Sequence, residues 1–304
     1  MVSRPPVARR NRPSAATIAV RRAVALLLVG GGIALLAWLG TIAWDAANGG
    51  KNGTPAPAPP KTLRIVFPEG FTRRQMAERI TAVDAIARRK RHVTPRLSAR
   101  AYLRVTASSP LPGKFAGDGK RRQLEGFLFP ATYDFTAKTT SRQLVTDQLA
   151  AFRANWKKVD LRYVRSRNLT RYGVLIIASM IEREVIAPKE RRLVAAVIYN
   201  RLHKRMPLGI DATTRYGLNI PSGRPLTQSE LASPNPYNTR NPNNLDLPPT
   251  PIANPGLASM QAAAHPAKVG YLYFVRKPDR IHHFFTSSLK KFNAYVAAHP
   301  VKGA

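Results

Sequence analysis

The sequence predicts an α+β protein made of a single N-terminal membrane helix, a small α+β module and a larger, mainly helical domain that ends in a β-hairpin. An uncharged stretch near the N-terminus is long enough to cross a bilayer. Residues 62–118 begin as a strand followed by an amphipathic helix, and most of the remaining chain shows apolar residues at helical spacing. Hydrophobic residues make up 44% of the 304 positions, which is enough for a buried core and excludes a disordered chain.

The predicted membrane helix covers residues 23–44, a run without a charged residue. A helix of this length matches a hydrocarbon core of about 30 Å, and Trp38 and Trp44 fall towards its far end, where aromatic rings favour the interface. The arginines that precede it are Arg4, Arg9, Arg10, Arg12, Arg21 and Arg22. The positive-inside rule then places residues 1–22 in the cytoplasm, as a basic tail, and residues 45–304 outside a plasma membrane that the chain crosses once. The alternative is a cleaved signal peptide, but the apolar stretch is long for one and shows no clear cleavage site.

The chain carries a net charge of +33 and no cysteine. The lack of cysteine excludes a disulfide framework, a cysteine-ligated zinc site and a thiol nucleophile. So large a positive charge can indicate a nucleic-acid-binding protein, but nucleic acid is not an expected partner outside the cell. Anionic wall polymers or lipid headgroups are the expected partners of this charge. The basic residues are scattered along the sequence, so a solvated basic surface without a dedicated partner is the alternative.

A linker and a small module follow the predicted membrane helix. Residues 45–61 are rich in Gly and then in Pro, which is typical of a semi-extended linker. In the module at 62–118, Leu63–Phe67 is expected to be a strand, and the turn after it leads into a helix from Arg73 to about Lys90. Thr72 is the expected N-cap of that helix.

Residues 119–304 form the predicted larger domain. It opens with an apolar and aromatic segment, Leu124–Phe135, whose first part reads as a strand. A Pro- and Asn-rich loop spans residues 221–251, and so long a loop inside a compact domain is usually functional. Asn254 is expected to cap a helix that starts at Pro255. The other expected elements are helices at 141–158, 190–204 and 287–298, and a hairpin of 271–276 with 281–285.

A run of apolar residues, Val174–Ile181, predicts a fully buried helix, and Glu182 follows it directly. The residues one helical turn from Glu182 are mostly apolar, so its carboxyl loses solvation of the charged form and favours holding a proton. A general acid that acts near neutral pH needs this property. Periodicity prefers Glu182 over Glu184 only slightly. The alternative is that both glutamates form structural ion pairs with nearby arginines, namely Arg183, Arg191 or Arg192.

Further polar residues suggest either binding or structural roles. Asn200 and Arg201 end the helix after Glu182 and can orient a sugar or a carboxylate, or can simply hydrogen-bond the following loop, which composition favours. His282 and His283 are neighbours on an expected strand, so they face opposite sides and do not easily chelate a metal together. The sequence requires neither a metal nor an organic cofactor.

Several blocks of sequence resemble one family. In chain order they read LIIASMIERE, VAAVIYNRLHKRMPLGIDATTRYGL, SPNPYNTR, LPPTPIANPGLASMQAAAHP, and YLYFV followed by HHFF. These blocks, within residues 171–290, are similar to the YceG-like endolytic murein transglycosylases (MltG). LEGFLFPATY resembles the segment that opens the catalytic region of that family, and residues 62–118 resemble its small LysM-like domain.

The resemblance implies cleavage of the β-1,4 bond between N-acetylmuramic acid and N-acetylglucosamine within a peptidoglycan strand, by a catalytic domain at 119–304. The family's catalytic glutamate falls on Glu182. The residues that match polar cleft positions of the family, and are therefore expected to bind substrate, are Asn200, Arg201, Asp211, Tyr237, Asn238 and Thr239. The sequence departs from the family pattern at Ala131, Gly209, Ala212 and Arg280, which concerns substrate contacts and not the reaction class.

The implied reaction needs one carboxyl group and no cofactor. Glu182 acts as acid and then as base, the muramic acid 6-hydroxyl attacks internally, and the product carries a 1,6-anhydro end. Peptidoglycan strands are the expected substrate and peptidoglycan synthases the expected protein partners, with nascent strand length as the quantity under control. Two alternatives remain: a non-catalytic wall-binding scaffold, and a hydrolytic muramidase in which Asp211 or Glu125 is a second carboxylate.

Overall fold

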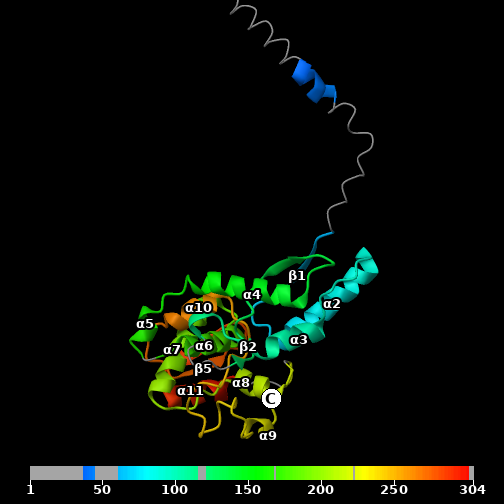
Figure 1. Cartoon of the computed structure of the whole chain (residues 1–304). Coiled ribbons are helices and arrows are strands. Elements are labelled where there is room, and N and C mark those ends of the chain that lie inside the picture. The colour runs from blue at the N-terminus through cyan, green and yellow to red at the C-terminus, as the bar shows by residue number, and fades with distance from the viewer. Residues whose placement is uncertain (1–36, 45–60, 116–120, 168, 222, 301–304) are drawn as a thin grey trace, which may run out of the picture. The chain divides into compact units, whose positions relative to one another are not determined.

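The computed structural model describes residues 37–44, 61–115, 121–167, 169–221 and 223–300 (Figure 1). The chain divides into two compact units, residues 1–59 and 60–304. In the first unit, residues 37–44 are helical and exposed, while the rest of the predicted membrane helix, the basic tail and residues 45–60 of the linker lie outside the described residues. No helix in the described ranges is both long and apolar enough to cross a membrane.

The second unit is built around α6 (Arg171–Glu184), whose residues 173–181 are all buried. This confirms the fully buried helix that the apolar run predicts. A helix that is apolar on every side must be covered on every side, and α7 (Arg191–His203) and α10 (Leu257–Ala264) pack against α6 and against each other (Figure 1). The end of α6 that carries Glu182 therefore emerges from the middle of the core.

The first strand of the second unit pairs with a strand that lies far from it in the sequence. β1 (Leu63–Val66) pairs antiparallel with β4 (Thr132–Phe135), in a register that places Ile65 opposite Tyr133. β4 lies beyond residue 118, so the β-pairing of the predicted small module reaches into the predicted larger domain. The turn after β1 and the segment before β4 are thereby held at fixed positions relative to α6.

The helices of the small module pack against each other and against the first helix of the larger domain. In α2 (Arg73–Arg91), Thr72 and Gln75 form a capping box in which each side chain accepts from the backbone of the other, which confirms the predicted helix and its N-cap. α3 (Ala99–Ala107) packs against α2 and also against α4 (Ser141–Trp156). These contacts connect residues on both sides of the boundary predicted at residue 118.

Two sequence-based expectations around residues 124 and 254 are wrong, for one shared reason. Residues 125–127 form a turn, and no strand forms at 124–129, with Gly126 at φ 88°. The Asn254 side chain accepts from the amides of Gly126 and Leu128, at 2.9 and 3.0 Å, so it does not cap a helix. α10 starts at Leu257 with Gly256 as its N-cap. A tertiary hydrogen-bond pattern thus replaces the local capping that the sequence suggests.

The C-terminal part contains the predicted hairpin and the final helix. β5 (Tyr273–Arg276) pairs antiparallel with β6 (His283–Thr286), and α11 (Leu289–Ala298) packs on both strands. The hairpin is confirmed, and the last helix begins two residues later than expected. The remaining elements are β2 (Ser109–Pro110), η2 (Gly113–Phe115), β3 (Arg121–Arg122), α5 (Arg162–Arg165), η3 (Pro188–Glu190), α8 (Asp211–Leu218) and α9 (Gln228–Leu231).

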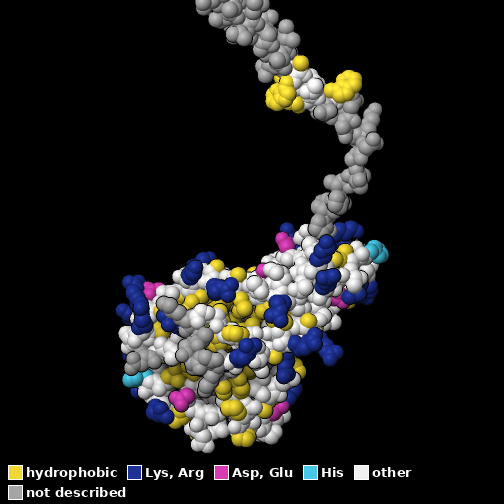
Figure 2. Space-filling view, in the orientation of Figure 1, with side chains coloured by type: hydrophobic (Ala, Val, Ile, Leu, Met, Phe, Trp, Pro, Cys, Tyr) yellow, Lys and Arg dark blue, Asp and Glu magenta, His cyan; other side chains and the backbone are white. Residues whose placement is uncertain are grey.

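The basic residues are spread over the surface. In Figure 2, Lys and Arg side chains are scattered across the visible face of the second unit, with apolar side chains between them. The four basic residues in the last turn of α2 are the densest run on a single helix, and they suit the negative end of its dipole. This distribution agrees with the scattered pattern seen in the sequence.

Candidate active site

Glu182 lies in the last turn of α6, where the buried helix ends. The residue is partly buried, between the fully buried Ile181 and the partly buried Arg183. Thr170 caps the other end of the helix by accepting from Gly173 N, and α6 ends at Glu184, with the extended backbone of Val185 as its C-cap. The rigid core therefore fixes the position from which the Glu182 side chain leaves.

One backbone amide holds the Glu182 carboxyl group. Gly256 directly precedes α10, so its N–H is among those that a helix leaves without an internal partner. It donates to Oε2 of Glu182 at 2.9 Å. In the part of the chain that the structure describes, Oε1 has no hydrogen-bond partner. Because Oε2 uses a lone pair to accept this hydrogen bond, a transferable proton on Glu182 belongs on Oε1.

A second carboxylate, that of Glu69, lies against the same glycine. A Cβ atom added to Gly256 would stand 1.7 Å from Oε1 of Glu69, so a larger residue here would displace the flexible end of that side chain. Burial of its carboxyl group raises the pKa of Glu69, the charge of Glu182 raises it further, and the charge of Arg191 lowers it. The two carboxyl groups thus share one small region beside the N-terminus of α10.

Asn254 ties together the segments that meet beside Glu182. Its Nδ2 donates to Phe71 O at 2.9 Å and to Glu125 Oε1 at 2.8 Å. Its backbone carbonyl accepts from Gly70 N, and its backbone N–H donates to Phe71 O, both at 3.0 Å. These bonds lock the turn that carries Glu69 onto the segment that carries Gly256.

Glu125 is buried and fully engaged. Its carboxylate accepts from Arg73 N at 2.9 Å, from Asn254 Nδ2 at 2.8 Å and from the Tyr216 hydroxyl at 3.2 Å. Burial raises the pKa of Glu125 to about 7, against the lowering effect of these hydrogen bonds and of the Arg73 charge. A carboxyl group with so many internal partners is poorly placed to activate a water molecule for hydrolysis.

Glu184 and Asp211 form a separate acidic pair. Glu184 lies close to the backbone N–H of Ala212 in the first turn of α8, which lowers its pKa. Burial, followed by the charge of Asp211, raises the pKa of Glu184. Asp211 itself forms an ion pair with Arg240 at 2.5 Å. Within the described ranges, neither Glu184 nor Glu182 forms an ion pair with an arginine. The structure therefore leaves Glu182 the more open of the two glutamates.

Asn200 and Arg201 contact backbone carbonyls. Asn200 Nδ2 donates to Val269 O and Tyr271 O, at 2.9 and 2.8 Å. Arg201 donates to three carbonyl oxygens, and its guanidinium lies 5.3 Å from the centre of the Tyr273 ring. These contacts fix the hairpin and the loop after α7. A role of either side chain in substrate binding stays a prediction.

The predicted binding residues of the long loop also form hydrogen bonds within the protein. Tyr237 shares a hydrogen bond with Thr250 at 2.8 Å, and its ring lies 5.2 Å from that of Tyr216. Asn238 is buried and donates to two loop carbonyls, while the buried Thr239 lies 2.9 Å from the Thr213 hydroxyl. Of the three loop residues that are predicted to bind substrate, Tyr237 is partly accessible, whereas Asn238 and Thr239 are buried. Their predicted contacts with substrate are not tested by these bonds.

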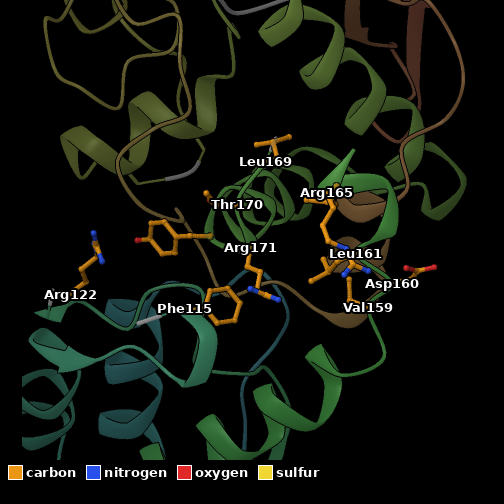
Figure 3. Close-up of a pocket in the computed structure, with 11 residues that line it drawn as sticks. Phe115, Arg122, Val159, Asp160, Leu161, Arg165, Leu169, Thr170 and Arg171 are labelled. Carbon is orange, nitrogen blue, oxygen red and sulfur yellow. The ribbon is translucent and has the colours of Figure 1, made fainter. Parts of the chain in front are cut away.

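Two sizeable cavities lie away from Glu182, beside the N-terminal end of α6. The first, of about 800 Å³, is lined by Phe115 and Tyr172 and by basic residues that include Arg165 and Arg171 (Figure 3). The second, of about 780 Å³, is lined by residues that include Asn200. Arg171 and Glu182 are separated by about 16 Å of helix, at 1.5 Å per residue. The candidate site is therefore open at Glu182 rather than enclosed in either cavity.

Sequence reasoning missed Glu69 and Gly256. Glu69 follows a proline in a short turn, a position that reads as surface, and Gly256 reads as the start of a helix. Glu69 and Gly256 are far apart in the sequence, so no local pattern predicts that the carboxylate lies against this N-cap glycine. No cluster of three or more potential metal ligands occurs among the described residues. His283 is buried against Glu190 at 2.6 Å, whereas His282 contacts Asp279, so the two histidines do face different partners.

Comparison with known proteins places this arrangement in a family. The model of the YceG-like family matches residues 49–298. The chain is 36% identical over 173 residues to the endolytic murein transglycosylase of Bacillus subtilis (strain 168), covering 57% of this chain and 47% of that protein. It is 30% identical over 267 residues to the endolytic murein transglycosylase of Streptococcus pneumoniae (strain ATCC BAA-255 / R6), covering 82% and 47%. The chain thus spans about half the length of the curated relatives it matches.

A solved structure supports the same placement. The crystal structure of a YceG-like protein from Listeria monocytogenes superposes with a TM-score of 0.62 at 31% identity, over 80% of this chain and 77% of that one. The family match covers well over half of the chain and includes every element around Glu182. This chain belongs to the YceG-like family.

Proposed function

We propose that this protein is an endolytic lytic transglycosylase, which cleaves the bond between N-acetylmuramic acid and N-acetylglucosamine inside peptidoglycan strands. The observation that carries the proposal is the Glu182 carboxyl group, held at Oε2 by Gly256 N and open at Oε1. Its position at the end of the buried α6 supports a fixed acid that faces a polymer lying across the surface. The curated relatives named as endolytic murein transglycosylases support the same reaction.

The reaction balances with one carboxyl group. Glu182 transfers its Oε1 proton to the glycosidic oxygen as the bond from that oxygen to the anomeric carbon breaks, and the departing N-acetylglucosamine unit gains a hydroxyl. The substrate's own N-acetyl oxygen meets the positive charge at the anomeric carbon. The muramic acid 6-hydroxyl then bonds to that carbon, and its proton returns to Glu182. No water is consumed, and the new end is a 1,6-anhydro sugar.

The surrounding residues serve this cycle by holding Glu182 in place. The Gly256 N–H binds an oxygen that is an acceptor in both protonation states, so the hydrogen bond can persist while the proton on Oε1 leaves and returns. Asn254 and Glu125 fix the segment that carries Gly256. This preorganisation means that the carboxyl group needs no rearrangement between the acid and base steps.

The test is replacement of Glu182 by glutamine, assayed by mass spectrometry of fragments released from purified peptidoglycan. Glu182→Gln can still accept from Gly256 N but cannot transfer a proton. We expect turnover to fall by at least about 10²-fold, with an unchanged melting temperature. Glu184→Gln is the matched control, two residues along the same helix, and should keep most of the activity. Anhydro-ended products at a near wild-type rate from Glu182→Gln would refute the assignment.

A hydrolytic muramidase is the second candidate function. The observation that favours it is the position of Glu69 close to Glu182. Many glycosidases use a second carboxylate to activate water, and Glu69 lies against the glycine that binds Glu182. The reducing end of the products separates the two reactions. An anhydro end supports the lytic route, and a free reducing end that incorporates ¹⁸O from labelled water supports hydrolysis.

We also propose the cellular setting that the sequence predicts. Residues 23–44 anchor the protein in the plasma membrane, residues 62–118 act as a LysM-like module that positions it on glycan, and peptidoglycan synthases are its partners in setting strand length. The support for the anchor is the long uncharged stretch with arginines before it. The support for the module is its resemblance to the LysM-like domain of the family.

A further inference from the structure

One cavity at the N-terminal end of α6 combines an apolar wall with three arginines. This basic cavity has a volume of about 800 Å³, within the usual range of ligand pockets. Its cations are Arg122, Arg165 and Arg171. Figure 3 shows Arg165 and Arg171 on one side of the cavity and Arg122 on the other. The apolar residues that line it are Phe115, Val159, Leu161, Val164 and Leu169.

Three separate elements present these arginines. Arg165 is the last residue of α5. Arg171 is the first residue of α6, directly after its N-cap Thr170. The guanidinium of Arg122, on β3, lies 5.5 Å from the centre of the Tyr172 ring, a distance at which a cation is attracted to the ring face. The positive charges therefore surround one space because of the tertiary fold.

The positive charge of the basic cavity is not neutralised from within. Asp160 is the acidic residue among those that line it, and Arg162 engages it, with N and Nε donating at 2.9 and 2.8 Å. Among the described residues, the guanidinium groups of Arg165 and Arg171 form no hydrogen bond or ion pair. Arg171 also stands at the positive end of the α6 dipole, which disfavours a cation. Stabilisation of the helix therefore does not explain Arg171.

We propose that the basic cavity binds the carboxylates of a short acidic peptide carried by the peptidoglycan strand, as a second point of contact with the substrate. The inference rests on the proposed function, because its ligand is part of the substrate named there. Muramic acid units of peptidoglycan carry short peptides with free carboxylates. Arginine guanidinium groups match the planar fork of a carboxylate, and the apolar wall suits the methyl and methylene groups of such a peptide.

The distance from the basic cavity to Glu182 suits a ligand carried by the strand. Arg171 and Glu182 lie near opposite ends of α6, about 16 Å apart along the helix. A five-residue peptide spans at most about 17 Å when it is extended. The peptide of a muramic acid unit near Glu182, or of the next unit along the strand, therefore has the reach to bring a carboxylate to the cavity. A glycan without peptides has no group of that length.

The test measures binding rather than turnover, by isothermal titration calorimetry with full-length protein in detergent micelles. The probes are a disaccharide peptide that ends in muramic acid, the same compound with its carboxylates converted to amides, and the disaccharide without peptide. None of them contains the bond that the enzyme would cleave. We expect amidation to weaken binding to wild type by at least about tenfold, because hydrogen bonds between arginine and carboxylate are charge-assisted. Equal affinity for the acid and the amide would overturn the proposal.

Arg165→Gln/Arg171→Gln makes the corresponding change in the protein. We expect it to bind the acidic disaccharide peptide at least about tenfold more weakly than wild type, and the disaccharide without peptide equally well. Its melting temperature should match that of wild type. Arg142→Gln/Arg153→Gln, at exposed positions on α4, removes the same charge and is the matched control. An equal loss in both double variants would show that net charge alone acts, and would overturn the proposal.

Glycerol phosphate, a soluble probe, tests whether the basic cavity prefers a phosphate. We expect it to bind more weakly than the acidic disaccharide peptide. Tighter binding of glycerol phosphate, with the same dependence on Arg165 and Arg171, would reassign the cavity to phosphate groups and overturn the proposal. Peptide binding by a wild-type protein that releases no anhydro-ended fragments would instead support the cavity and defeat the proposed function, so the two failures are distinguishable.

Discussion

Glu125 shows at the residue scale how the fold stabilises the candidate site. The carboxyl group is 2% exposed and is bound by Arg73 N, Asn254 and Tyr216. Through Asn254 it connects the turn of Glu69 with the segment of Gly256. None of these hydrogen bonds involves Oε1 of Glu182. Its role is structural, and its protonation is therefore linked to stability.

The pKa of Glu125 predicts a pH-dependent loss of stability. Its folded pKa is about 7, against an ordinary value of 4.5. Because the pKa is raised, the protonated Glu125 carboxyl group contributes fully to the stability of the fold below about pH 4.5. This contribution is lost as pH rises through about 7. Glu125→Gln has no group that ionises here, so its free energy of unfolding should not fall in this way. We expect the variant to become more stable relative to wild type as pH rises, by up to about 3 kcal/mol. Urea denaturation from pH 5 to 9 measures this, and a pH-independent difference would contradict it.

At the scale of elements, α7 is connected to the C-terminal hairpin by one side chain. Arg201 donates to Leu272 O at 2.6 Å, and to Pro207 O and Leu208 O at 3.0 and 2.8 Å. The planar guanidinium satisfies carbonyls from two separate segments, a geometry that a lysine ammonium cannot reproduce. The β1 and β4 pairing plays a similar part on the other side of the core, where it fixes the turn of Glu69.

Arg201→Lys therefore tests whether this residue supports structure or substrate. Loss of the bidentate contacts should cost about 1.5–3 kcal/mol of stability, since these are hydrogen bonds from a charged group. We expect a melting temperature several degrees lower, with KM little changed at temperatures where the protein stays folded. Arg205→Lys, at an exposed position in the same loop, is the control and should be silent. A raised KM without loss of stability would favour direct substrate binding.

At the scale of the whole molecule, the net charge of +33 and the uncharged stretch at 23–44 predict how the protein is placed in the cell. The folded unit at 60–304 carries scattered basic side chains, which suit a compartment rich in anionic wall polymers (Figure 2). The reaction proposed here also requires contact with peptidoglycan. Both considerations favour an extracytoplasmic folded unit.

The anchor proposal predicts a single-pass topology. Protease added outside spheroplasts should digest residues 45–304 and leave the cytoplasmic tail with its membrane helix protected. N-terminal sequencing of the membrane-bound protein should start at or near Met1. A mature N-terminus near Ala46 would identify a cleaved signal peptide instead.

The sequence by itself determined the elements whose signals are local. The apolar run before Glu182 predicts a buried helix because burial follows side-chain type, and the caps and the hairpin depend on neighbours in the chain. The resemblance added Glu182 as the expected catalytic residue. Only the tertiary structure decided that Glu69, Glu182 and Gly256 meet, and that Asn254 clamps distant segments rather than capping a helix. These contacts join residues 74 to 187 positions apart, and a pairing at such separation has no periodicity or spacing by which the sequence could reveal it.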